Sequence, residues 1–350
     1  MIRRLMLSAA LMSPFAARGQ PARAQAVRPQ AAKRGFYDSG TKELAVRFAG
    51  SGDVMLAGTL LLPIKSELQK VPGVVLVAGS GPTDRDGNNP LAPERIDLLK
   101  QLAELLAEAG IGSLRYDKRG IGGSTPRVRG TLEDEERFVT WDHFVGDVLA
   151  AHAELVRHDE IKAYATALLG HSEGGLLALA AAPQIAANKP HALVLAATPG
   201  RPFGEILRAQ IARSAPKLSD GVQRVLSAIQ ETGHIPSGLP KELEILFPAY
   251  AGPFLQRLIA FEPAAALANL DQACLVIQGG ADRQVVPMED VQPLIDALGK
   301  RTVSGEAIVI PSVSHNLKLV TWPTDPGFTG PIAPAAASKL KDWLTTALGA

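Results

Sequence analysis

A pentapeptide near the middle of the chain has the composition of a nucleophile turn. Residues 170–174 read Gly-His-Ser-Glu-Gly, which places Ser172 between two glycines in the pattern G-x-S-x-G. An apolar run precedes it and an Ala/Leu-rich run follows, so the pattern lies in the strand–turn–helix context that gives it meaning. We predict that Ser172 is a nucleophile. The N–H of Glu173, at the start of a helix whose dipole favours negative charge, is predicted to stabilise an oxyanion.

A serine hydroxyl is a weak nucleophile, and it needs a base that is itself oriented by a carboxylate. In one known order of such triads, the acid and then the histidine follow the serine along the chain. Asp282 follows one predicted strand and His315 follows the last, and no other histidine lies after Asp282. The segment after the strand at 192–196 contains no carboxylate that could replace Asp282. These positions predict the triad Ser172, His315 and Asp282.

A second donor to the oxyanion is expected from the loop that follows the predicted strand at 74–78. This loop begins Gly-Ser-Gly-Pro, and such small residues let the backbone approach a reacting carbonyl closely. We assign the N–H of Ser80 to this role, with Gly81 as the alternative.

Two further loops carry charged residues. Asp84, Arg85 and Asp86 are expected to pair with each other and stiffen their loop, with a site for a charged substrate group as the alternative. Residues 117–124 are rich in glycine, but Thr125 stands where G-x-G-x-x-G requires its last glycine. We therefore expect a structural turn there and not a phosphate site.

The elements that must position these residues alternate between strands and helices. Predicted strands are 44–48, 54–62, 74–78, 111–116, 165–169, 192–196, 274–278 and 307–310. Predicted helices are 95–109, 138–157, 173–182, 291–298 and 335–348. This alternation predicts an α/β fold with a largely parallel sheet and helices on both faces.

The segment between the sixth and seventh predicted strands is too long for an ordinary loop and shows helical patches. We interpret residues 200–268 as a helical cap inserted above the sheet. Its aromatic residues Phe247, Tyr250 and Phe254 are the candidate lining of an apolar substrate pocket, although helices that pack on a sheet need such residues in any case.

The N-terminus has the pattern of a secretory signal peptide. Residues 1–26 begin Met-Ile-Arg-Arg, continue with an apolar stretch and end in Ala-Gln-Ala. The apolar stretch is too short to cross a bilayer, which takes about 20 residues. We therefore expect export to the periplasm or the medium, no stable membrane insertion after cleavage, and a flexible lead-in at 27–42. The arginine pair leaves Sec and Tat export both open.

Composition narrows the classes of function. The 36 basic and 35 acidic residues give a net charge of +1, not the basic excess of a general nucleic-acid-binding surface, so we predict no nucleic-acid partner. The single cysteine, Cys274, excludes an intrachain disulfide framework and a multi-cysteine zinc site, and we predict no metal. With 46% hydrophobic residues the chain can bury a large core.

Together these motifs resemble the α/β-hydrolase superfamily. The turn at 170–174, the loops at 79–87 and 117–120, and the loops of Asp282 and His315 carry the resemblance, which spans most of the chain after the predicted leader. Within the superfamily, the Gly-Ser-Gly-Pro loop looks like that of bacterial carboxylesterases grouped with serine aminopeptidase-like hydrolases. The His-Gly pair of many relatives is replaced by Ala-Gly, which affects the assignment of the oxyanion donor.

The resemblance implies an α/β-hydrolase fold with a core at 43–199 and 269–350, an eight-stranded, mostly parallel sheet and no cofactor. It implies a serine esterase that cleaves small-molecule carboxylic esters through an acyl-enzyme. One alternative is a peptidase or amidase, which would need a carboxylate in the cap such as Glu242, Glu244 or Glu262. The other is a non-catalytic binding protein on the same fold. Oligomeric state is left open.

Overall fold

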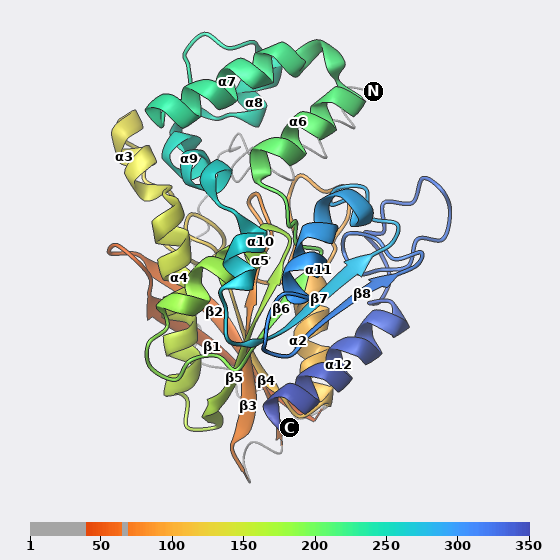
Figure 1. Cartoon of the computed structure of the whole chain (residues 1–350). Coiled ribbons are helices and arrows are strands. Elements are labelled where there is room, and N and C mark those ends of the chain that lie inside the picture. Colours follow the sequence, from red (N-terminus) through yellow and green to blue (C-terminus); the bar gives the residue numbers. More distant parts are fainter. Residues whose placement is uncertain (1–39, 65–68) are drawn as a thin grey trace.

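The computed structural model describes residues 40–64 and 69–350, so the predicted signal peptide and most of the predicted lead-in lie outside the described residues. The described strands form one eight-stranded sheet in the order β1-β2-β4-β3-β5-β6-β7-β8 (Figure 1). They are β1 (Thr41–Ala49), β2 (Met55–Pro63), β3 (Val71–Val77), β4 (Gly112–Tyr116), β5 (Ile161–His171), β6 (Ala192–Ala196), β7 (Ala273–Gly279) and β8 (Gly305–Ile310). Only the β1–β2 and β2–β4 pairs are antiparallel. The predicted eight-stranded, mostly parallel sheet is confirmed, and β1 and β2 form an N-terminal antiparallel hairpin.

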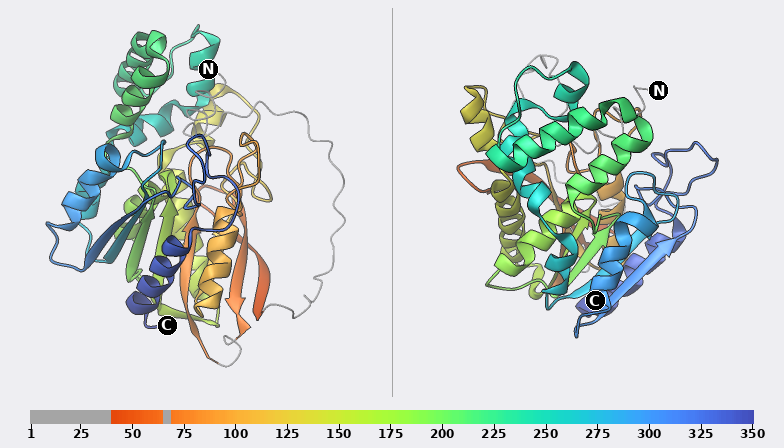
Figure 2. Two further views of the ribbon diagram at one scale, coloured as in Figure 1. Left: turned by 90° about the vertical axis from the view of Figure 1, so that its right-hand side faces the viewer. Right: turned by 45° about the horizontal axis from the view of Figure 1, so that its top comes forward.

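Helices cover both faces of the sheet because the central strands are buried on both sides. Val74 and Leu76 of β3 belong to one hydrophobic cluster, and Val75 and Val77 belong to the other. The first cluster includes α2 (Leu98–Glu108) and α12 (Pro334–Leu348). The second includes α4 (Trp141–Arg157), α5 (Glu173–Ala181) and α11 (Gln292–Leu298). The two layers are visible from two sides in Figure 1 and Figure 2.

The predicted helix at 138–157 corresponds to α4, which begins three residues later and ends where predicted. A separate helix, α3 (Leu132–Phe138), precedes α4 and begins at a capping box between Thr131 and Asp134. Thr140 then caps α4, its hydroxyl accepting a hydrogen bond from the N–H of His143 at 3.2 Å. The sequence pattern missed α3 because that helix is highly charged and has few apolar residues to mark its period.

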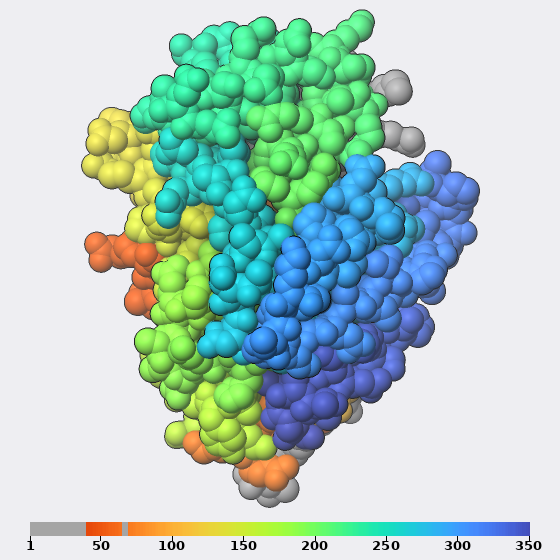
Figure 3. Space-filling view, viewed as in Figure 1, coloured from red at the N-terminus to blue at the C-terminus, as the bar shows by residue number. Residues whose placement is uncertain are grey.

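Between β6 and β7 the chain forms α6 (Phe203–Ser214), α7 (Ser219–Thr232), α8 (Lys241–Leu246), α9 (Gly252–Ala260) and α10 (Pro263–Ala268). Helices α6 to α9 form a block above the sheet, which the space-filling view shows in green and teal (Figure 3). By contrast, α10 packs beside α5 and α11, in the layer that covers the sheet. Phe254 of α9 anchors the block, because its ring lies 5.7 Å from that of Trp141 and 5.2 Å from that of Phe144.

A buried ion pair ties the loop after β4 to α4. Arg119 and Asp147 are each 1% exposed, and the guanidinium donates two hydrogen bonds to the carboxylate at 2.8 and 2.7 Å. Arg119 also donates to the carbonyls of Ser51 and Phe138. One side chain therefore joins the β1–β2 turn, the loop after β4 and the region between α3 and α4.

We expect Arg119→Met to lower the free energy of unfolding by about 3–5 kcal/mol, because it leaves the Asp147 carboxylate buried without a cation. Urea unfolding followed by circular dichroism measures this loss. Arg137→Met is the matched control, since Arg137 pairs with Glu133 and Asp134 at the exposed surface, and it should change stability little. Equal, small losses in the two variants would contradict the importance of the buried pair.

Candidate active site

Ser172 lies at the junction of β5 and α5, and its backbone has a positive φ, which residues other than glycine rarely adopt. Its φ is 54° and its ψ is −123°, so the backbone turns sharply and the side chain stands clear of both elements. Both flanking positions require glycine, because a Cβ atom at either one would clash with nearby backbone atoms. A Cβ on Gly170 would lie 2.3 Å from the carbonyl oxygen of Gly174, and one on Gly174 would lie 2.3 Å from that of Val77. The strand, the turn and the helix therefore form the arrangement expected of the G-x-S-x-G motif.

Asp282 and His315 are joined by a hydrogen bond in which His315 Nδ1 lies 2.7 Å from Asp282 Oδ2. The same carboxylate oxygen accepts from Gln278 Nε2 at 2.9 Å. The other oxygen accepts from the N–H groups of Gln284 and Val285 at 2.8 and 3.0 Å. Because Asp282 receives four donors, its orientation is fixed. With Nδ1 donating to the carboxylate, Nε2 of a neutral His315 is left as an acceptor.

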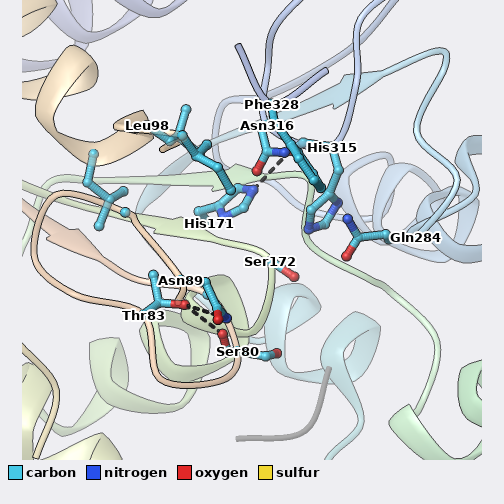
Figure 4. Close-up of a pocket in the computed structure, with 14 residues that line it drawn as sticks. Ser80, Thr83, Asn89, Leu98, His171, Ser172, Gln284, His315, Asn316 and Phe328 are labelled. Carbon is cyan, nitrogen blue, oxygen red and sulfur yellow. Dashed lines mark hydrogen bonds between the residues drawn. The ribbon is translucent and has the colours of Figure 1, made fainter. Parts of the chain in front are cut away.

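Ser172 and His315 line one pocket together with Ser80 (Figure 4). Ser172 Oγ forms no hydrogen bond with His315 within the described chain, and both groups face the shared hollow. A long contact of this kind is common in serine sites without a bound substrate. The structure thus brings the three predicted triad residues to one site, although their catalytic roles stay predictions.

Neutral residues make up the rest of the pocket wall. The apolar ones are Ile96, Leu98, Leu99 and Phe328, and the polar ones include Thr83, Asn89, Gln284 and Asn316. None of the described lining residues is a carboxylate, a lysine or an arginine. The pocket therefore has no group that would hold an ionic part of a substrate.

A buried lysine holds two segments of the pocket wall in place. Lys318 is 1% exposed, and its Nζ donates to the carbonyl oxygens of Ile96 at 2.5 Å and Phe328 at 3.0 Å. These two residues lie far apart in sequence, and each lines the pocket. The ammonium thus joins the segment before α2 to the long loop after β8.

His171, which directly precedes Ser172, supports the loop that carries His315. Its Nε2 donates to the carbonyl oxygen of His315 at 2.9 Å, and the two rings lie 4.8 Å apart. Burial lowers the pKa of His171 to about 3, so its ring stays neutral at neutral pH. His171 therefore places no second positive charge beside His315.

The loop predicted to supply an oxyanion donor has free N–H groups. Neither Ser80 nor Gly81 donates its N–H to an acceptor within the described chain, and Ser80 lines the pocket. The carbonyl of Ser80 is fixed by the hydroxyl of Thr83, which donates to it at 2.8 Å (Figure 4). Glu173 opens α5, so its N–H has no partner inside the helix. All three predicted donors are therefore unengaged.

The charged side chains Arg85 and Asp86 form ion pairs with the residue after β4 and with β4, and not with each other, whereas Asp84 accepts a hydrogen bond from the Asp86 N–H. Arg85 donates from Nη2 to Asp117 at 2.6 Å, and Asp86 accepts from Arg115 Nε at 3.0 Å. Asp84 accepts from N–H groups of its own loop. Burial alone would raise the pKa of Asp117, but the hydrogen bonds from Arg85 and the loop outweigh it and hold that pKa below its usual value. The three residues stiffen the loop, and none of them lines the pocket.

The cap aromatics do not line the described pocket. Phe247 and Phe254 are buried in the hydrophobic core, and the ring of Tyr250 lies 4.4 Å from the guanidinium carbon of Arg127. The apolar wall comes from the start of α2 and from Phe328 instead. Sequence reasoning missed these residues because a leucine at a helix start looks like ordinary packing and a long loop has no periodic signal.

Residues 40–64 and 69–350 contain no group of three or more His, Cys, Asp or Glu residues placed to hold a metal ion. They also contain no helix with the length and apolar composition needed to cross a membrane.

Known proteins resemble this chain in sequence and in fold. The model of a family described as an alpha/beta hydrolase family matches residues 74–326. Esterase EstD of Thermotoga maritima is 30% identical over 249 residues, which cover 70% of this chain and only 54% of that protein. Among solved structures, an esterase of Pyrococcus furiosus has a TM-score of 0.55 at 16% identity, covering 88% of this chain and 92% of that one. Est1E of Butyrivibrio proteoclasticus with bound ferulic acid has a TM-score of 0.56 at 16% identity, covering 87% and 100%. At such identities the structures support the fold alone.

Proposed function

Because the chain belongs to the alpha/beta hydrolase family, we propose that it is a serine esterase that cleaves carboxylic esters with Ser172, His315 and Asp282. The observation that carries this proposal is the 2.7 Å hydrogen bond between His315 and Asp282, in a pocket that His315 shares with the strained Ser172. The Thermotoga maritima relative is named an esterase, which supports the same activity for this chain.

The proposed mechanism is built on the hydrogen bond between His315 and Asp282. His315 Nε2 takes the proton of Ser172 Oγ as the oxygen attacks the ester carbonyl, and Asp282 stabilises the resulting imidazolium. The N–H groups of Glu173 and Ser80 donate to the oxyanion of the tetrahedral intermediate, each such donor being worth about 3–4 kcal/mol. His315 then protonates the departing alcohol. Water attacks the acyl-enzyme by the same steps and releases the acid.

The neutral pocket favours an uncharged ester with a short to medium or aromatic acyl group. An aminopeptidase-like activity would need a carboxylate that holds the substrate's amine. The cap residues proposed for that role, Glu242, Glu244 and Glu262, do not line the described pocket. We therefore favour esters over aminoacyl amides as substrates.

Export is a second proposal, since residues 1–26 have the pattern of a cleaved leader. When the full chain is expressed in a bacterial host, the exported protein should begin near Val27. N-terminal sequencing of the periplasmic fraction and the medium measures this. An exported protein that retained Met1 would contradict cleavage.

Ser172→Ala should lower kcat for a p-nitrophenyl ester by about 10³–10⁶-fold, because it removes the nucleophile. The same variant should no longer react with a fluorophosphonate probe. Ser237→Ala, a change at an exposed serine of the cap region, serves as the matched control and should keep both properties. Full ester turnover by a pure Ser172→Ala preparation would refute the assignment of the nucleophile.

Ester and amide activities can be compared on the same protein. We expect turnover of neutral p-nitrophenyl esters and little turnover of aminoacyl p-nitroanilides, because none of the described pocket residues carries a charge that could bind the substrate ammonium group. The measurement is the ratio of the two kcat/KM values. A higher value for the aminoacyl anilide would favour the peptidase alternative.

A further inference from the structure

Lys118 contacts both segments that carry the proposed oxyanion donors. It follows β4 and is 4% exposed. Its Nζ donates to the carbonyl oxygen of Gly79 at 2.6 Å and lies 3.9 Å from Oε1 of Glu173. Gly79 directly precedes Ser80, and Glu173 directly follows Ser172. One ammonium group thus lies between the loop after β3 and the start of α5.

The bond to Gly79 determines where the N–H of Ser80 points. The carbonyl of Gly79 and the N–H of Ser80 belong to a single peptide unit, which is planar and trans, so the two groups point in opposite directions. A cation that fixes the carbonyl oxygen therefore fixes the N–H on the other side. It also polarises the peptide, which makes the N–H a stronger donor in a buried site.

The two buried charges depend on each other. Burial lowers the pKa of Lys118, and the carboxylate of Glu173 opposes that shift. Burial raises the pKa of Glu173, and Lys118 opposes it. The Ser80 side chain also lowers the pKa of Glu173, and the Lys118 ammonium is the larger of these two compensating influences on the buried acid.

The adjacent residue secures the far end of the same loop. Asp117 accepts from the N–H of Arg85 at 2.8 Å and from its guanidinium at 2.6 Å. The consecutive residues 117 and 118 thus hold the loop on either side of Ser80. We propose that Lys118 is a positioning residue of the oxyanion hole, which aims the Ser80 N–H by holding the Gly79 carbonyl. This inference rests on the proposed esterase function.

Lys118→Met, which keeps the length of the side chain but removes its donor and charge, tests this role. We expect kcat for a p-nitrophenyl ester to fall by about 10- to 100-fold with little change in KM, somewhat less than the loss caused by deleting a donor outright. Affinity for a trifluoromethyl ketone, whose adduct with Ser172 carries an oxyanion, should fall by the same factor. A purely structural role would not link kcat and ketone affinity in this way.

Arg119→Met is the control, because it removes the neighbouring buried cation, which points away from the loop toward Asp147. It should lower stability yet keep kcat and ketone affinity at temperatures where it is folded. Lys118→Leu, which also lacks a donor and a charge, provides the same comparison should the methionine variant not fold. Wild-type kcat and ketone affinity in the Lys118 variants, or losses that merely parallel the loss of stability, would overturn the inference. A wild-type protein inert to esters and to fluorophosphonate would instead refute the proposed function.

Discussion

The carbonyl oxygen of Val77, at the end of β3, lies so close to Gly174 that even a methyl group would not fit between them. This contact determines how β5 can pass into α5, because the chain must reverse within the few residues around Ser172. The positive φ of Ser172 is the local cost of that reversal. The same reversal places Ser172 at the carboxyl ends of the central strands, where the loops after β3, β7 and β8 also converge.

These converging loops have little regular structure, and buried polar groups hold them in place. Lys318 joins the segment before α2 to the loop after β8. Asp282 is oriented by the side chain of Gln278 and by two N–H groups of its own loop. Each of these polar groups would be costly to bury alone, and each is satisfied by several hydrogen-bond partners, from distant segments for Lys318 and mostly from its own loop for Asp282. The pocket is therefore preorganised by hydrogen bonds as much as by apolar packing.

The sequence was most informative where the local signal and the tertiary environment agree. The strand at 192–196 was predicted with the boundaries it has, because every residue of β6 is buried and apolar. The triad residues follow from a motif and a chain order. By contrast, α3 has a local capping box but too few apolar residues to show a helical period, and the core position of Phe254 depends on contacts that no local pattern encodes. The neutral pocket wall, including Phe328, was unpredictable for the same reason.

The group that Ser80 is proposed to offer to the oxyanion is a main-chain N–H, which every residue except proline possesses. Replacing the Ser80 side chain by one other than proline therefore leaves this N–H in the chain. Variation can also act on it through the residues that hold its peptide unit, and here the carbonyl partner is a lysine supplied by another loop. Substitution at position 118 is therefore a route to tuning the strength of this donor. That position lies outside the pocket lining and outside the G-x-S-x-G motif by which such sites are recognised.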